Sequence, residues 1–301
     1  MEEKDIQSLL SHTDSLLNQT FWFSQKFKIK PDKEHFATSI TYTDVLERRN
    51  DFINCLLSTI NSFVYSKRKS SELINKFFEE TSDFGNASAK LTFNAKKKFR
   101  PGHPQGQFGE LLLFNFIQHF FSATPVLRKM SITTSNKHER FGADAIHYKI
   151  NSNGENVFFL GESKCYKTKY KFKSAFKDSL NSISKSFEEI NDELDLYLYE
   201  DGMIDGNLVE IVEKLKSNTL SNVKFELVCI IIYHETREID KTNETEIKER
   251  IKEIIEEKFK SVGDEVYDKI DKGVLERINY IVFPVWKLDN LLDEFMKTLG
   301  A

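Results

Sequence analysis

Cysteine, proline and glycine are scarce in this chain of 301 residues, which contains 3 Cys, 5 Pro and 12 Gly. The cysteines, Cys55, Cys165 and Cys229, are far apart and form no C-x-x-C pair. This spacing excludes a disulfide framework and a cysteine zinc site, and it indicates a reducing compartment. So little proline and glycine argues against a low-complexity chain and against a long disordered linker.

Long apolar runs are missing as well. None approaches the ~20 residues that a membrane helix needs, and the first ten residues, MEEKDIQSLL, lack the basic and then apolar pattern of a signal peptide. We therefore expect a cytoplasmic protein with no membrane association. The chain also has no P-loop and no G-x-G-x-x-G motif, so any use of ATP must come from a partner.

Positive charge is not in excess, because the formal net charge is −4. The total therefore carries no signal for nucleic acid, but local patches matter more than the sum. Basic side chains gather in one short stretch, at Lys164, Lys167, Lys169, Lys171, Lys173 and Lys177. Such a patch suits a phosphate backbone, although a solvated helix face is the alternative interpretation.

The most informative stretch is residues 141–173, which reads as two strands joined by a tight Asn/Gly turn. Residues 157–160 are continuously apolar, as in a strand buried on both faces. Glu162 and Lys164 are two residues apart, so they point to the same side of that strand. A hairpin centred on Asn153 places Asp144 directly opposite Glu162, while a slip of one residue would separate them. Two carboxylates and an ammonium then lie close together. Burying these charged groups costs free energy, and a bound cation or substrate would explain why they are there.

A third carboxylate precedes this stretch. Residues 108–121, FGELLLFNFIQHFF, predict a helix that is hydrophobic nearly all round and therefore buried. Glu110 lies in line with Leu113 and Ile117, so we expect it to point into the protein. The alternative is a first-turn Glu placed there by the helix dipole.

The order from residue 108 onward is helix, three strands, helix, strand, helix, strand and helix. This order predicts an α/β fold with a mixed central sheet covered by helices on both faces. The breaker cluster FRPGHPQGQ at residues 99–107 is the best boundary. We therefore expect a mixed or helical N-terminal region at residues 1–98, which makes partner contact, and one domain at residues 99–301.

Glu110, Asp144 and the triplet Glu162-Ser163-Lys164 resemble the signature of the PD-(D/E)xK nuclease superfamily, with Gly-Ala-Asp where the superfamily has Pro-Asp. The predicted element order at residues 105–235 is similar to the restriction-endonuclease-like core of that superfamily. The segments RPGHPQGQFGELLL, RFGADAIHY and FFLGESKCYK resemble more closely the HamA family, the nuclease subunits of the Hachiman antiphage defence system. The resemblance implies a metal-dependent nuclease that acts on DNA in a hetero-complex with a helicase, HamB, which holds it in check.

The resemblance also assigns roles. Asp144, Glu162 and the backbone carbonyl of Ser163 would hold Mg²⁺, or Mn²⁺ in its place, because these hard cations prefer oxygen ligands. Lys164 would position the attacking water or stabilise charge on the phosphate, and Glu110 would ligate the metal or orient its waters. The DNA backbone would be held by Lys167, Lys169, Lys171, Lys173 and Lys177.

Three other interpretations stay open at this point. The Asp/Glu/Lys set is a structural salt-bridge cluster in the first. In the second, the chain is a non-catalytic subunit that keeps the nuclease fold to bind DNA or a protein. In the third, it is a structure-selective repair nuclease or resolvase.

Overall fold

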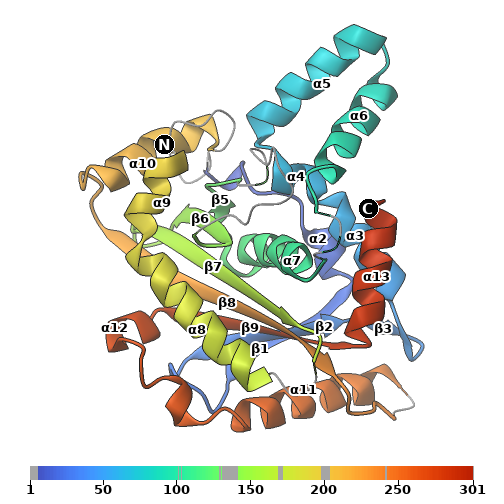
Figure 1. Cartoon of the computed structure of the whole chain (residues 1–301), viewed down its shortest axis with the longest axis vertical. Coiled ribbons are helices and arrows are strands. Elements are labelled where there is room, and N and C mark those ends of the chain that lie inside the picture. Colours follow the sequence, from blue (N-terminus) through green and yellow to red (C-terminus); the bar gives the residue numbers. More distant parts are fainter. Residues whose placement is uncertain are drawn as a thin grey trace.

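The structure is a computed structural model that describes residues 6–100, 102, 104–128, 130, 142–168, 172–197, 204–240 and 243–300. Within these residues a seven-stranded sheet in the order β1-β2-β9-β8-β7-β6-β5 runs through the centre of the molecule (Figure 1). Its strands are β1 (Thr20–Lys26), β2 (Glu34–Ile40), β5 (Thr124–Pro125), β6 (Ala145–Ile150), β7 (Asn156–Tyr166), β8 (Val223–Glu235) and β9 (Ile278–Trp286). A separate two-residue pair, β3 (Tyr42–Thr43) and β4 (Leu46–Glu47), follows β2.

The sheet is mixed, as the sequence predicts. Strands β7, β8 and β9 are parallel to one another, and β2 is parallel to β9. Strands β1, β6 and β5 each pair antiparallel with a neighbour. Strand β8 lies in the middle, and its run FELVCIIIY is buried from Leu227 to Tyr233, because helices cover both faces of the sheet. The predicted fold class, a mixed sheet flanked by helices and compatible with a restriction-endonuclease-like core, is confirmed.

One hydrophobic cluster lies on each face of the sheet. The first contains Val157 and Phe159 of β7 together with the helices α2 (Asp14–Leu17), α3 (Arg49–Ser58), α4 (Ile60–Val64), α5 (Lys67–Thr81), α6 (Phe84–Lys96), α7 (Pro104–Phe121) and α13 (Leu288–Leu299). The second contains Phe158 and Leu160 together with α8 (Phe172–Glu188), α9 (Ile190–Tyr197), α10 (Gly206–Lys216), α11 (Glu244–Lys260), the 3-10 turn η1 (Asp264–Val266) and α12 (Lys272–Leu275). Successive residues of β7 thus face α7 and α8 alternately.

The N-terminal part of the chain shares this sheet. Strands β1 and β2 come from residues 1–98, and β2 pairs with β9 near the C-terminus. The boundary expected at residues 98 and 99 therefore separates two stretches of sequence that build one sheet. Helices α5 and α6 project from the body as a hairpin (Figure 1). A deletion of residues 1–95 would remove two strands as well as this hairpin, so it cannot isolate a partner-binding role.

Two local expectations need adjustment. The apolar stripe between Phe172 and Leu194 predicts one long helix, but the structure divides it at Glu189 into α8 and α9. The sequence also predicts a strand over residues 126–132; among its described residues Leu127 forms a bridge with Ile204, and β5 at Thr124–Pro125 directly precedes the range. Residues 129 and 131–141 lie outside the described part of the chain.

Candidate active site

The antiparallel pairing of β6 with β7 decides whether the two carboxylates meet. Ala145 pairs with Gly161 and Ile150 with Asn156, which is the register of a hairpin centred on Asn153. The Asp144 N–H donates to the Gly161 carbonyl at 2.9 Å, and the carboxylate Oδ2 of Asp144 accepts from the Ser163 N–H at 2.8 Å. The predicted register is confirmed, and Asp144 is attached by two hydrogen bonds to the strand that carries Glu162.

Glu162 and Lys164 form an ion pair on the α8 side of β7. The Lys164 Nζ donates to the Glu162 Oε1 at 2.7 Å. Glu162 is only 6% exposed, whereas the Lys164 side chain keeps 23% of its surface accessible. Asp144 alternates with Ile146, whose side chain packs in the same cluster as Phe176 of α8. The two carboxylates and the amine therefore share one side of the sheet.

The electrostatics of this group are unusual. Burial, which is the largest influence, and then the charge of Asp144 raise the pKa of Glu162 to about 7, against the opposing effect of Lys164. Burial alone would lower the pKa of Lys164. The charge of Glu162, its hydrogen bond and the charge of Asp144 together have a larger effect, so the pKa of Lys164 is raised overall. Lys164 is therefore protonated at neutral pH, while Glu162 titrates near neutral pH.

Glu110 reaches the site from a different layer. It lies in the first half of α7, which packs on the opposite face of β7 from Glu162. Its side chain is half-buried, and its charge contributes the smallest of the named influences on the pKa of Glu162. Glu110 is therefore partly exposed, and its charge acts on Glu162 from the other side of the strand; its inward orientation stays a prediction.

Two glycines allow α7 to approach β7 this closely. A Cβ atom added at Gly109 would lie 2.1 Å from Oγ of Ser163 and 3.5 Å from Cδ1 of Ile232. A Cβ atom added at Gly161 would lie 2.9 Å from atoms of both Ile117 and Leu113, and 3.2 Å from Cβ of Ala145. The absence of side chains at these two positions brings Glu110 next to the strand of Glu162 and Lys164.

We predict that Gly161→Ala lowers the free energy of unfolding by about 1–3 kcal/mol, because an inserted methyl group overpacks the contact between α7, β6 and β7. Urea denaturation of the purified protein measures this change. The matched control is Gly206→Ala at the start of α10, where an added Cβ meets no atom within 4 Å. Equal stability of Gly161→Ala and the unmodified protein would contradict the close approach.

The oxygen donors suit a hard divalent cation, although they do not form a complete cage. Among the described residues no group of three or more His, Cys, Asp or Glu side chains is placed to hold a metal ion. Mg²⁺ needs only one or two carboxylates, because waters and a substrate phosphate complete its shell. Asp144 and Glu162 supply two, and the pKa of Glu162 is raised mainly by burial and then by the charge of Asp144. A divalent cation would favour the ionised form of both carboxylates, so the donor set fits the metal; ligation by the Ser163 carbonyl stays a prediction.

The predicted DNA-binding lysines are only partly described. Lys169 and Lys171 lie outside the described residues. Lys167 pairs with Asp289 of α13 at 3.0 Å, and Lys173 pairs with Glu265 of η1, whereas Lys177 is exposed on α8. The patch is therefore partly neutralised within the chain, but exposed ion pairs contribute little and a phosphate can replace the carboxylate.

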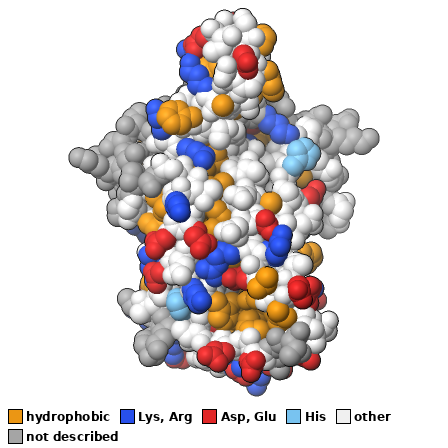
Figure 2. Space-filling model, turned by 90° about the vertical axis from the view of Figure 1, so that its right-hand side faces the viewer, with side chains coloured by type: hydrophobic (Ala, Val, Ile, Leu, Met, Phe, Trp, Pro, Cys, Tyr) orange, Lys and Arg blue, Asp and Glu red, His pale blue; other side chains and the backbone are white. Residues whose placement is uncertain are grey.

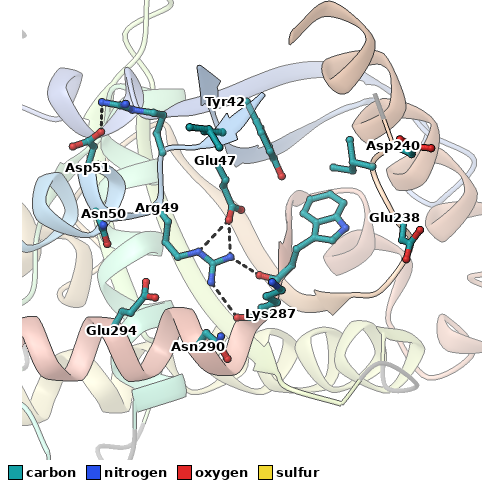
Figure 3. Close-up of a pocket in the computed structure, with 14 residues that line it drawn as sticks. Tyr42, Glu47, Arg49, Asn50, Asp51, Glu238, Asp240, Lys287, Asn290 and Glu294 are labelled. Carbon is teal, nitrogen blue, oxygen red and sulfur yellow. Dashed lines mark hydrogen bonds and ion pairs between the residues drawn. The ribbon is translucent and has the colours of Figure 1, made fainter. Parts of the chain in front are cut away.

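A pocket of about 1040 Å³ lies at the carboxyl ends of β8 and β9 (Figure 3). Its Arg49 is fully engaged, because Nη2 donates to Oε2 of Glu47 and to the Trp286 carbonyl, both at 2.6 Å. Figure 2 shows acidic and basic side chains intermingled on the face that carries α13 and β3. The sequence did not identify this pocket, and its mixed charge does not extend the lysine patch.

The sequence also did not identify Glu193 of α9, which is 5% exposed and accepts a hydrogen bond from the Ala143 N–H at 2.9 Å. Residues 188–201 are rich in acidic side chains. The spacing of Glu193 relative to apolar residues could have indicated its burial. Glu193 lies three residues after the buried Ile190 and directly before the buried Leu194. A glutamate beside an apolar helical stripe is a candidate for burial.

Comparison with known proteins identifies one family. A family model described as HamA matches residues 17–299, which is nearly the whole chain. No curated protein matches the sequence. In the part of the chain that the structure describes, no helix combines the length and the apolar character required to cross a bilayer.

Proposed function

Because the chain belongs to the HamA family of the Hachiman antiphage defence system, we propose that it is a metal-dependent nuclease that hydrolyses DNA phosphodiester bonds. The observation that carries the proposal is the meeting of Asp144 with Glu162 and Lys164 on one side of the sheet. Asp144 directly precedes β6, and Glu162 lies in the second half of β7, toward its carboxyl end. Open α/β sheets bind their ligands at the carboxyl ends of parallel strands.

Each residue type has a chemical reason to be there. Asp144 and Glu162 would hold Mg²⁺, or Mn²⁺ in its place, with the Ser163 carbonyl as a further ligand. The metal supplies polarisation of the scissile phosphate and lowers the pKa of bound water. Lys164, protonated and fixed by Glu162, would position the attacking water or stabilise charge that develops on the phosphate. Glu110 would hold or orient metal-bound waters from the α7 side.

The proposed partners follow from the family. The substrate is DNA, and a HamB-type helicase in the same complex would hold the nuclease in check until foreign or damaged DNA is sensed. A cytoplasmic location, where that DNA lies, is part of the proposal. The chain contains no P-loop motif, so the helicase would also supply any use of ATP.

Plasmid degradation by the purified chain tests the proposal, with and without the helicase and in Mg²⁺ or EDTA. We expect cleavage in Mg²⁺ without the helicase, none in EDTA, and less when the helicase is present. Absence of cleavage in Mg²⁺ and Mn²⁺ under every condition would reject the nuclease assignment. DNA binding by the unmodified protein and by Lys164→Ala alike, with no nicking by either one in Mg²⁺, would favour a non-catalytic subunit. Preference for branched junctions over linear duplex would favour a repair nuclease or resolvase.

We predict that charge reversal of Lys173 and Lys177 to glutamate weakens DNA binding and lowers its salt dependence. Each lost phosphate contact reduces the slope of log K against log salt concentration by about 0.9. Fluorescence anisotropy with a duplex at several salt concentrations measures both quantities. The control is the double reversal of Lys214 and Lys224, exposed lysines on α10 and at the start of β8. If the two double variants show the same slope of log K against log salt concentration, Lys173 and Lys177 do not contact the DNA backbone.

A further inference from the structure

The backbone immediately before Asp144 contacts a buried carboxylate from another helix. Oε2 of Glu193 accepts the Ala143 N–H at 2.9 Å, across 50 residues of sequence. Gly142, at φ +90°, lies against the same carboxyl group, because an added Cβ atom would be 2.1 Å from its Oε2 and 2.2 Å from its Cδ. Residue 142 therefore has no room for a side chain while Glu193 occupies this place.

This contact completes the support of Asp144. On the other side, the Asp144 N–H donates to Gly161 and the Asp144 carboxylate accepts from Ser163. The three residues 142–144 are thus held between β7 and α9. Loss of the Glu193 side chain would remove the hydrogen bond that attaches this backbone to α9.

The Glu193 carboxylate lies beside apolar neighbours. Ile190 and Leu194 anchor α9 in the hydrophobic cluster that also contains Ala143 and Ile146. A leucine in place of Glu193 would match these neighbours, but it could not accept a hydrogen bond from the Ala143 N–H. The contact with the backbone therefore requires an acceptor oxygen on the side chain of residue 193.

We propose that Glu193 is a positioning residue, which holds the Gly142–Ala143 backbone so that Asp144 faces Glu162. This inference rests on the proposed function, because it gives Glu193 a part in the same metal site. Glu193 acts through the backbone of its neighbours, so it is not itself expected to contact metal or DNA. Its replacement should change the metal affinity of the site rather than the chemistry of Lys164.

The test compares Glu193→Ala with Glu193→Gln by calorimetric titration of the whole chain with Mn²⁺. Removal of a residue that orients a ligand typically lowers metal affinity by about 10–100-fold, and we expect this for Glu193→Ala. Glu193→Gln should stay near the unmodified protein, because its amide oxygen still accepts from Ala143. Gly142→Ala should reproduce the loss by displacing the carboxyl group. Asp192→Asn, an exposed neighbour on α9, is the control and should bind Mn²⁺ normally.

Hydrogen exchange separates this inference from the proposed function. Amides of residues 142–150 should exchange faster in Glu193→Ala and not in Glu193→Gln, whether or not metal binds. The inference is overturned if folded Glu193→Ala binds Mn²⁺ as tightly as the unmodified protein, if Glu193→Gln loses as much affinity, or if exchange is unchanged. If the unmodified protein does not bind Mn²⁺, or if Asp144→Ala binds it equally well, the metal site itself is rejected. Faster exchange would then still support the contact between Glu193 and the backbone.

Discussion

Lys164→Ala is expected to lower the rate of Mg²⁺-dependent DNA cleavage by about 10²–10³-fold, because removal of one preorganised donor aimed at developing charge has an effect of that size. The Lys164 ammonium is held 2.7 Å from Oε1 of Glu162 and is shielded from most of the solvent. Its pKa is raised, so the lost group is a fixed positive charge. The measurement is the single-turnover cleavage rate of a labelled duplex at saturating enzyme.

The control for this prediction is Lys185→Ala, which removes an exposed lysine from α8, 71% accessible at its side chain. Circular dichroism should show that both variants fold. Lys164→Ala should bind DNA with little change, because the proposed backbone contacts come from other lysines. Cleavage by Lys164→Ala at an undiminished rate would show that Lys164 has no part in the chemistry. The pair of Glu162 and Lys164 would then be a structural ion pair.

The second large effect concerns pH. The pKa of Glu162 is raised from its ordinary value of 4.5 to about 7, mainly by burial and then by Asp144. Metal binding requires the deprotonated carboxylate, so protons compete with the metal below pH 7. Mn²⁺ affinity should therefore fall by about tenfold for each pH unit below 7 and level off above it. Titration calorimetry between pH 5.5 and 8 measures this profile, and an affinity independent of pH in that range would contradict it.

Stability provides an independent readout of the same pKa. A carboxyl group with a raised pKa in the folded state stabilises that state most when it is protonated, below pH 4.5. This contribution is lost as the pH rises through about 7. Without metal, the free energy of unfolding of Glu162→Gln should therefore exceed that of the unmodified protein by about 1–3 kcal/mol at pH 8. The difference should vanish near pH 4.5. Added Mn²⁺ should stabilise only the protein that retains Glu162.

Several features of the site follow from local patterns. A strand alternates its side chains with a period of two, so Glu162 and Lys164 had to share a side. The Asn/Gly turn between two apolar runs set the centre of the hairpin, and with it the register that places Asp144 opposite Glu162. The near-continuous apolar character of residues 108–121 likewise predicted a buried helix, and α7 is buried along most of its length. Each of these features depends on residues that are close in sequence.

Other features depended on contacts between distant segments. The pattern around Glu193 places it beside a buried stripe, but only the packing of α9 against residues 142–143 brings its carboxylate to the Ala143 N–H. In the same way, the pairing of β2 with β9 joins the N-terminal part of the chain to the sheet, and Asp289 and Glu265 reach Lys167 and Lys173 from the C-terminal third.

Periodicity and turn chemistry thus determined which side chains share a strand face and how the hairpin pairs, because backbone geometry repeats over a few residues. The tertiary structure alone decided which face α7 covers, which strands flank the parallel core and which charges neutralise one another. The physical reason is that these choices depend on the joint packing of many elements, and no short segment contains the information about its distant neighbours.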